Sequence, residues 1–188
     1  MPSLVGSEMC IRDRLNATLT EKAESYFKSN GYIIKKTTME DNYDVNEEIE
    51  KFKWADVVFF QTPLNWMGVS WSFKKYIDEV FSMGMMGEMS AGDGRSKEAP
   101  KKNYGLGGKL NGKYMMSVTA NAPKEAFNNP EETFFNGISE DELLKPMHLN
   151  FKWFGFEQLP TFMAYDVMKN PEIENDFIRF ENHLKANF

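Results

Sequence analysis

The chain has 188 residues, a length typical of one compact domain, so no second domain is required. Hydrophobic residues make up 41% and charged residues 27%, a globular composition that argues against disorder. The net charge is −6 and no basic stripe alternates with aromatics, which disfavours nucleic acid as a partner. The longest uncharged stretch, residues 57–73, contains too many polar residues to span a membrane.

Cysteine usage and the N-terminus indicate the compartment. Cys10 is the single cysteine, so no disulfide can form within the chain and a reducing, cytoplasmic environment is expected. The first residues lack the basic start, apolar stretch and cleavage site of a secretory signal.

Residues 1–14 are unusual. Residues 8–14, Glu-Met-Cys-Ile-Arg-Asp-Arg, resemble one reading frame of the transposon end used to prepare sequencing libraries. We therefore expect residues 1–14 to be a non-native segment and residues 15–188 to form the domain. The alternative is a native but uncommon N-terminus.

The first half of the chain alternates between helical and strand patterns. Helical spacing of apolar residues predicts helices over residues 15–29, 46–54 and 70–81, the last capped by Ser70. Short β-branched and aromatic runs predict strands over residues 32–37 and 55–60. The second run is almost continuously apolar, as expected of a central strand covered on both faces.

The second half continues the alternation after an irregular stretch. Residues 83–112 contain eight glycines and are expected to form a long loop. A buried strand is predicted over residues 113–119, a helix over 143–154 with Pro146 in its first turn, a strand over 159–165 and a closing helix from Pro171 to about residue 186.

This order predicts an α/β fold, a three-layer sandwich with a parallel sheet between helices. The predicted domain begins with a helix, so its sheet is one strand short, and we expect the native first strand to be missing. In the flavodoxin strand order 2-1-3-4-5, that strand lies inside the sheet, so its loss would expose the edges of its neighbours.

Two polar loops follow predicted parallel strands, at the end of the sheet where ligands bind. They are residues 62–68 and residues 119–123. Pro63 fixes one backbone angle, Trp66 offers a broad apolar surface, and loop amides could bond the edge of a flat heterocycle. The alternative is that Pro63 and Trp66 are ordinary turn and core residues.

Several segments together resemble one family. Residues 56–81, from Asp-Val-Val-Phe-Phe-Gln-Thr-Pro-Leu-Asn-Trp to Asp-Glu-Val-Phe, resemble the corresponding block of flavodoxin-like NAD(P)H quinone reductases, and the family called modulator of drug activity B is the best match. Further agreement comes from Trp54-Ala-Asp56, Asp93-Gly-Arg95, residues 102–108, Asn121-Ala-Pro123, Glu125-Ala-Phe127 and residues 159–162. The similarity extends from Leu15 to the C-terminus.

The resemblance implies a homodimeric enzyme that binds FAD, takes hydride from NADPH and reduces quinones by two electrons. It also implies the residues of the flavin site. The expected flavin-binding residues are Leu15, Asn16 and Thr18 at the end of the phosphate-binding segment, Pro63, Leu64, Asn65 and Trp66 along the ring, Tyr104, and Thr119, Ala120, Asn121 and Ala122 in the second loop. The resemblance also leads us to expect that residues 1–14 stand in place of the family's opening strand and the body of its phosphate-binding loop.

The function predicted is therefore that of an FAD-dependent NADPH:quinone oxidoreductase. One alternative is a non-enzymatic electron carrier or flavin-binding module similar to flavodoxin, and another is a truncated, inactive form of the enzyme. The cofactor carries the hydride in such enzymes, so no catalytic acid or base is assigned.

Other residues have two interpretations each. His148 and His183 are too far apart to suggest a metal site, and His148 is either near the quinone or, as we favour, packed locally. Arg95 could attract a nucleotide phosphate or lie in an exposed turn. The methionines of residues 83–89 form an adaptable surface or fill gaps in the core. Residues 105–108 precede a strand, so their glycines do not form a dinucleotide fingerprint.

Overall fold

A computed structural model describes residues 4–188, with the side chains of residues 14–188. Its centre is one parallel sheet. β2 (Lys113–Thr119) pairs with β1 (Val57–Pro63) along one edge and with β3 (Glu157–Gln158) and β4 (Phe162–Ala164) along the other. The predicted strand over residues 113–119 is confirmed, and so is the parallel α/β arrangement.

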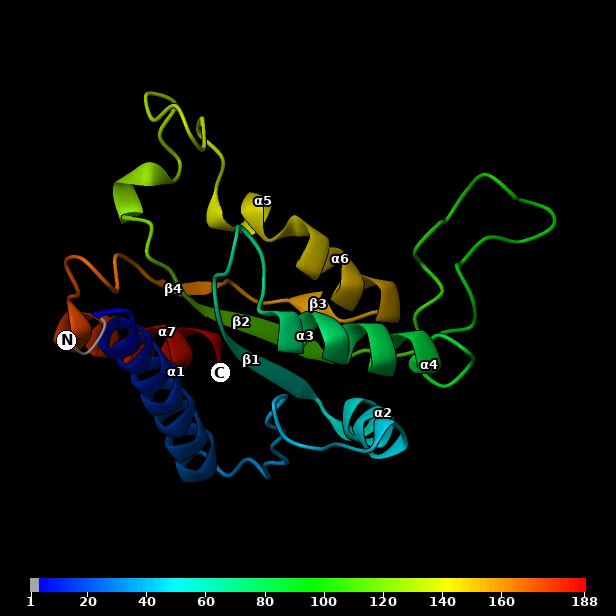
Figure 1. The fold of residues 1–188 in the computed structure, drawn as a ribbon. Helices are drawn as coiled ribbons and strands as arrows, with labels where there is room; N and C mark the ends of the chain where they lie inside the picture. Colours follow the sequence, from blue (N-terminus) through cyan, green and yellow to red (C-terminus); the bar gives the residue numbers. More distant parts are fainter. Residues whose placement is uncertain (1–3) are drawn as a thin grey trace.

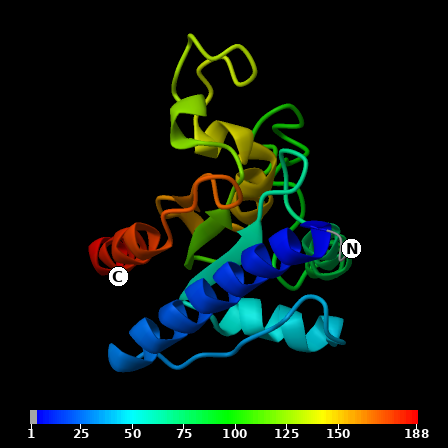
Figure 2. The same ribbon diagram turned by 60° about the vertical axis from the view of Figure 1, so that its left-hand side comes forward.

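Helices cover both faces of this sheet (Figures 1 and 2). One face carries α1 (Leu4–Ser29) and α7 (Ile173–Asn187). The other carries α2 (Val45–Trp54), α3 (Trp71–Tyr76), the π-helix η1 (Ile77–Phe81), α4 (Ser82–Gly84), α5 (Glu140–Leu143) and α6 (Lys145–Phe154). A short 3-10 helix, η2 (Lys124–Ala126), follows β2. The three-layer sandwich is thus confirmed.

Each face of the sheet has its own hydrophobic core, because successive side chains of a strand point to opposite faces. Met115 of β2 is buried in the core beneath α1 and α7. Its neighbours Tyr114 and Met116 are buried in the other core, beneath α3 and α6. β2 therefore contributes to both cores and is buried along nearly its whole length.

Local sequence signals set several helix ends as predicted. The Ser70 hydroxyl accepts the Phe73 N–H at 3.3 Å at the start of α3. Pro146 lies in the first turn of α6, and Gly155 ends that helix with φ of 98°, a left-handed conformation that suits glycine. The predicted helix over residues 143–154 is confirmed as α6, which begins at Lys145, and the separate short helix α5 ends just before it at Leu143.

Two strand predictions are wrong. Residues 32–37 have no regular secondary structure and pair with no strand, because among residues 4–188 no strand lies between them and β1 to supply a ladder. β1 is an edge strand and not a central one, since its only partner among the described strands is β2. Its apolar character reflects the helices on its two faces, not strands on both edges.

Three other boundaries differ from the predictions. α1 starts at Leu4, eleven residues before the predicted start of the domain. Of the predicted strand over 159–165, only Phe162–Ala164 forms a strand, β4; β3 ends just before the predicted range, and between the two lies Pro160, which has no N–H for the ladder. Residues 85–112 form the predicted irregular segment, which extends beyond the end of α4 in Figure 1.

Candidate functional site

The two loops that follow β1 and β2 lie side by side at the carboxyl end of the sheet. The register places Pro63 opposite Thr119, and the Leu64 N–H donates to the Thr119 carbonyl at 2.8 Å. The parallel ladder therefore continues one residue beyond β1 and holds the two loops together. This is the end of an open α/β sheet where ligands bind.

The first loop ends in a tight two-residue turn. Asn65 and Gly68 exchange backbone hydrogen bonds of 2.8 and 3.0 Å, and Trp66 and Met67 between them have φ of 46° and 62°. Positive φ at both central positions is typical of a type I′ turn, which normally contains Asn or Gly. The conformation is costly for these side chains, and such strain concentrates at functional sites.

Trp66 projects fully into solvent. Its side chain is 97% exposed, so the interpretation of Trp66 as a core residue is wrong. Leu64, two positions before Trp66, packs partly against the core and anchors the turn. The result is a flat, unpartnered aromatic surface on a fixed turn beside the Thr119 loop.

The second loop is held from the opposite side by the end of β4 and the residues that follow it. The Ala120 N–H donates to the Ala164 carbonyl at 2.8 Å, and the Ala122 carbonyl accepts the Asp166 N–H at 3.1 Å. Thr119 and Ala120 are buried, whereas Asn121 is exposed at the tip. The loop is thus a rigid wall with one exposed amide side chain.

Asn16 is the residue of α1 that reaches this site. Its side-chain oxygen accepts from Gln61 Nε2 at 2.7 Å and from the Thr119 hydroxyl at 3.2 Å. Leu15 instead lies in the core beneath α1, and the Thr18 hydroxyl donates to the Arg14 carbonyl. Asn16 therefore joins the first helix to the ends of β1 and β2.

Gln61 was not among the predicted site residues. The available signal was the change from apolar residues 57–60 to polar Gln61 and Thr62 at the end of the same strand. Its Nε2 holds Asn16, while its Oε1 is buried without a hydrogen-bond partner among the described residues. A buried acceptor of this kind, beside a ligand-binding edge, is a candidate contact for a donor supplied from outside.

Tyr104 lies away from this site. Its ring packs edge-on against Trp153, with the ring centroids 5.3 Å apart, and the Arg95 guanidinium lies 5.5 Å from its centroid. Trp153 is near the end of α6, and Figure 1 shows residues 85–112 at the opposite end of the sheet from the turn before α3. Within one chain, Tyr104 does not meet the two loops.

The other candidate residues of the segment 83–112 are Arg95 and the methionines. Arg95 is paired with Asp93 at 2.6 Å in an exposed turn. Met83, Met85 and Met86 are exposed, whereas Met89 is fully buried, so only Met89 fills a gap in the core. Among the described residues, no group of three His, Cys, Asp or Glu side chains is arranged to hold a metal ion.

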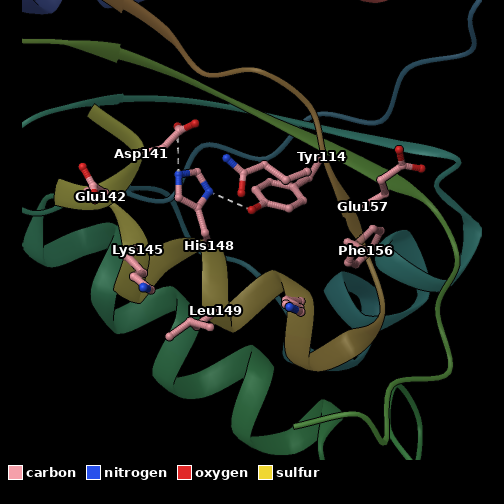
Figure 3. A pocket seen from close by; sticks show the side chains of 10 residues that line it. Tyr114, Asp141, Glu142, Lys145, His148, Leu149, Phe156 and Glu157 are labelled. Carbon is pink, nitrogen blue, oxygen red and sulfur yellow. Dashed lines mark hydrogen bonds and ion pairs between the residues drawn. The ribbon is translucent and has the colours of Figure 1, made fainter. Parts of the chain in front are cut away.

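A separate cavity of about 520 Å³ lies between α5, α6 and the β3 edge (Figure 3). His148 lies between two partners there: its Nδ1 is 2.7 Å from the Tyr114 hydroxyl, and its Nε2 is 3.3 Å from Asp141 Oδ1. The hydrogen bond from His148 lowers the pKa of Asp141, while burial raises the pKa of the Tyr114 phenol.

This cavity is distant from the two loops. Tyr114 is five residues before Thr119 on β2, which corresponds to about 16 Å at roughly 3.3 Å per residue. His148 is buried and hydrogen-bonded to Tyr114 of the adjacent strand, as the local-packing interpretation expects. The Tyr114–His148–Asp141 chain therefore links β2 to α5 and α6 and takes no part in the site at the loops.

Comparison with known proteins places the fold in a family. The chain belongs to the family described as having a flavodoxin-like fold, whose profile matches residues 11–186.

Among known sequences, the chain is 42% identical over 175 residues to the NADPH:quinone oxidoreductase MdaB of Haemophilus influenzae, covering 93% of this chain and 90% of that protein. It is 40% identical over 176 residues to an uncharacterised protein of Schizosaccharomyces pombe, covering 93% and 89%. The family resemblance noted from the sequence is thereby confirmed.

Solved structures agree on the fold. A provisionally assigned quinone reductase of Klebsiella pneumoniae superposes with a TM-score of 0.75 at 23% identity, covering 92% of this chain and 79% of that chain. General stress protein 14 of Treponema denticola, solved in complex with FMN, gives a TM-score of 0.54 at 20% identity, covering 77% and 74%. No described helix is long and apolar enough to cross a membrane.

Proposed function

We propose that this protein is an FAD-dependent NADPH:quinone oxidoreductase that acts in the cytoplasm as a homodimer. The observation that carries the proposal is the hydrogen bond from Leu64 to Thr119, which sets the two post-strand loops together beside the exposed indole of Trp66. The identity with the Haemophilus influenzae enzyme, over nearly the full length of both chains, supports the same activity.

The residues at the loops fit the ring of a flavin. Trp66 presents an open aromatic surface on the first loop. The second loop forms a rigid wall, joined to the first by the Leu64–Thr119 hydrogen bond, and consists of Thr119, Ala120, Asn121 and Ala122. Pro63, Leu64 and Asn65 would lie along the ring, and Gln61 Oε1 could accept from a ring N–H. When bound, the flavin would accept hydride from NADPH and deliver two electrons to the quinone. The chain orients the ring and keeps the loops fixed.

The phosphate end of the cofactor fits less well. Leu15, Asn16 and Thr18 lie inside α1, where backbone N–H groups bond to carbonyls four residues earlier and are not free for phosphate. Leu15 is also buried in the core. Asn16 therefore contributes through its side chain alone, and we expect this chain to hold FAD mainly by the ring and hence weakly. Weak FAD binding is also what we expect if this chain is a truncated form of the enzyme.

The position of Tyr104 supports a homodimer. Its ring is 69% exposed at the opposite end of the sheet from the two loops, so it can complete a flavin site only in a second copy. We infer that Tyr104 of one subunit faces the loop pair of the other. Sedimentation of the FAD-loaded protein should then give twice the mass of one chain, and Tyr104→Ala should weaken FAD binding without unfolding the protein.

The activity is tested by loading the purified protein with FAD or FMN and following NADPH oxidation in the presence of a naphthoquinone. We expect FAD to support quinone-dependent oxidation, with FMN less effective. Flavin binding without NADPH oxidation would favour the electron-carrier alternative. Absence of both flavin binding and oxidation would contradict the proposal.

The ring contact is tested by Trp66→Asn, which keeps a residue suited to positive φ but removes the indole. Loss of one aromatic stacking contact is worth about 1 kcal/mol, so FAD affinity should fall roughly fivefold. Trp54→Asn is the matched control, because Trp54 is a half-exposed indole at the end of α2, where β1 begins. Equal FAD affinity in the two variants would contradict the assignment of Trp66.

A further inference from the structure

The cavity between α5, α6 and the β3 edge is a second candidate binding site, separate from the two loops (Figure 3). Its volume of about 520 Å³ lies within the range of roughly 300–1,000 Å³ that is typical of small-molecule sites. We propose that this cavity binds a flat, apolar molecule with an acidic group at each end, of the aromatic dicarboxylate class.

The base of the cavity is held rigidly by the core. Tyr114 of β2 and Phe156, which follows α6, are both buried there. The Tyr114 hydroxyl donates to His148 Nδ1 at 2.7 Å, so the other ring nitrogen, Nε2, carries the proton and faces Asp141. A ligand therefore meets a preformed surface and does not have to order these side chains.

The two acids of α5 that line the cavity already have partners in the protein. Glu142 Oε2 accepts the N–H and the hydroxyl of Ser139, at 2.8 and 3.1 Å, in a capping box. Asp141 Oδ1 lies 3.3 Å from His148 Nε2. The third acid of the cavity, Glu157, is exposed on β3. A cationic ligand would thus find one acid, Glu157, that is not already engaged.

The cations of the cavity are available. Lys145 and Lys152 both line it, both are exposed, and neither forms a salt bridge with any of residues 14–188. Lys145 affects Glu142 only as a charge at longer range. Two available lysines against the single available acid Glu157 leave an excess of positive charge, which favours an anionic ligand.

The spacing of the lysines defines the shape of this ligand. Lys145 and Lys152 are seven residues apart on α6, about 10.5 Å along the axis at roughly 1.5 Å per residue. Leu149 lies between them on the same helix face, and its side chain lines the cavity while 53% exposed. The face therefore matches an apolar body with an acidic group at each end.

A rigid aromatic body suits this arrangement better than a flexible chain. A flat ring system covers Leu149 and loses little conformational freedom on binding. Once one carboxylate is paired with Lys145, the second is held near Lys152, so the second ion pair forms without a further loss of translational freedom. A molecule with one carboxylate can pair with only one of the two lysines at a time.

The experiment titrates nitrogen-15-labelled protein with naphthalene-2,6-dicarboxylate and follows the amide chemical shifts. We expect the largest shifts at His148, Leu149, Lys152 and Gln158, which line the cavity. The affinity should be about three- to tenfold higher than that of 2-naphthoate, which carries one carboxylate, and should fall as salt is added. Naphthalene-2,6-dicarboxamide has the same shape without charge and should bind at least tenfold more weakly.

Variants test each part of the site. Lys145→Met and Lys152→Met each remove one charge and keep an apolar stem, so in either variant the dicarboxylate should bind no better than 2-naphthoate. Lys169→Met, at an exposed lysine outside the cavity, is the matched control and should change neither affinity. Leu149→Gln should weaken both probes about threefold. All four side chains are exposed, so far-UV circular dichroism should show unchanged folding.

Three results would overturn the proposal. The first is equal affinity of the dicarboxylate for the wild type and both cavity-lysine variants. The second is equal binding of the dicarboxamide, and the third is a set of shifts centred on Trp66 and Asn121, which would place the probe at the two loops. None of these readouts requires flavin or NADPH, so they are independent of the quinone reductase activity.

Discussion

At the scale of single residues, two small polar clusters fix how layers of this protein meet. Asn16, Gln61 and Thr119 join α1 to the ends of β1 and β2, where the two loops begin. Tyr114 and His148 join β2 to α6 inside the opposite core. In both clusters, short side-chain hydrogen bonds connect residues far apart in the chain, so each cluster fixes a distance that hydrophobic packing alone would leave adjustable.

Removing the Tyr114 hydroxyl tests the second cluster. Tyr114→Phe leaves the buried His148 Nδ1 without a partner while keeping the ring that stacks on Phe151. We expect the free energy of unfolding to fall by about 1–3 kcal/mol in urea denaturation. Tyr104→Phe, at an exposed hydroxyl, should change it by less than about 0.5 kcal/mol. Equal effects would contradict a role for the His148 contact.

The charge of Asp141 gives this cluster a pH dependence. Because the hydrogen bond from His148 lowers the pKa of Asp141 in the folded state, its carboxylate stabilises the fold at any pH above the ordinary value of about 3.9. The contribution is lost as the pH falls below that value through the folded pKa. Asp141 is half exposed, so Asp141→Asn should cost less than about 1 kcal/mol at pH 6.

Urea denaturation of both proteins between pH 6 and 3 measures this effect. The stability difference between the wild type and Asp141→Asn should be constant above about pH 4.5 and shrink below it. A difference that grows on acidification would have the wrong sign for a lowered pKa.

At the scale of elements, glycines let the irregular segment pack against α6 and against itself. A Cβ on Gly108 would lie 2.2 Å from the Phe154 carbonyl carbon, and one on Gly107 would lie 2.0 Å from the Gly92 oxygen. Glycine composition predicted an irregular loop over residues 83–112, but backbone contacts between distant residues give this loop its shape. Those contacts are invisible to local sequence patterns.

Gly108→Ala tests this packing. The new methyl group would overlap the end of α6, so we expect a loss of about 2–4 kcal/mol in unfolding free energy together with increased proteolysis of residues 85–112. Gly68→Ala is the matched control, because its Cβ would make only an ordinary contact of 3.9 Å. Similar stabilities of the two variants would show that the segment packs differently.

At the scale of the whole molecule, the two hydrophobic cores lie on opposite faces of the same sheet and share its strands. Phe180 of α7 is fully buried on one face of the sheet and Phe151 of α6 on the other, and β2 contributes side chains to both cores. Disruption of either core therefore removes support from the same central ladder. We expect the domain to unfold as one cooperative unit.

Phe180→Ala tests this coupling. Loss of a buried phenylalanine should cost about 3–5 kcal/mol, with the same urea midpoint by tryptophan fluorescence and far-UV circular dichroism. Ile178→Ala, on the exposed side of the same helix, should cost much less. Separate transitions for the two probes would show that the cores unfold independently.

The sequence by itself determined most of the local structure. Capping at Ser70, the helix end at Gly155 and the apolar run of residues 113–119 depend on neighbours in the chain, and each was predicted correctly. The pairing of the two post-strand loops also followed, because parallel strands bring their carboxyl ends to one edge.

Only the tertiary structure decided features that depend on distant partners. Residues 32–37 have a strand-like sequence but form no strand, since a strand needs a ladder that another part of the chain must supply. The edge position of β1, the burial of Leu15 and the separation of Tyr104 from the loops likewise depend on where other elements pack. The spacing of residues along the chain predicts local secondary structure, whereas these long-range arrangements are set only when the helices pack on the sheet.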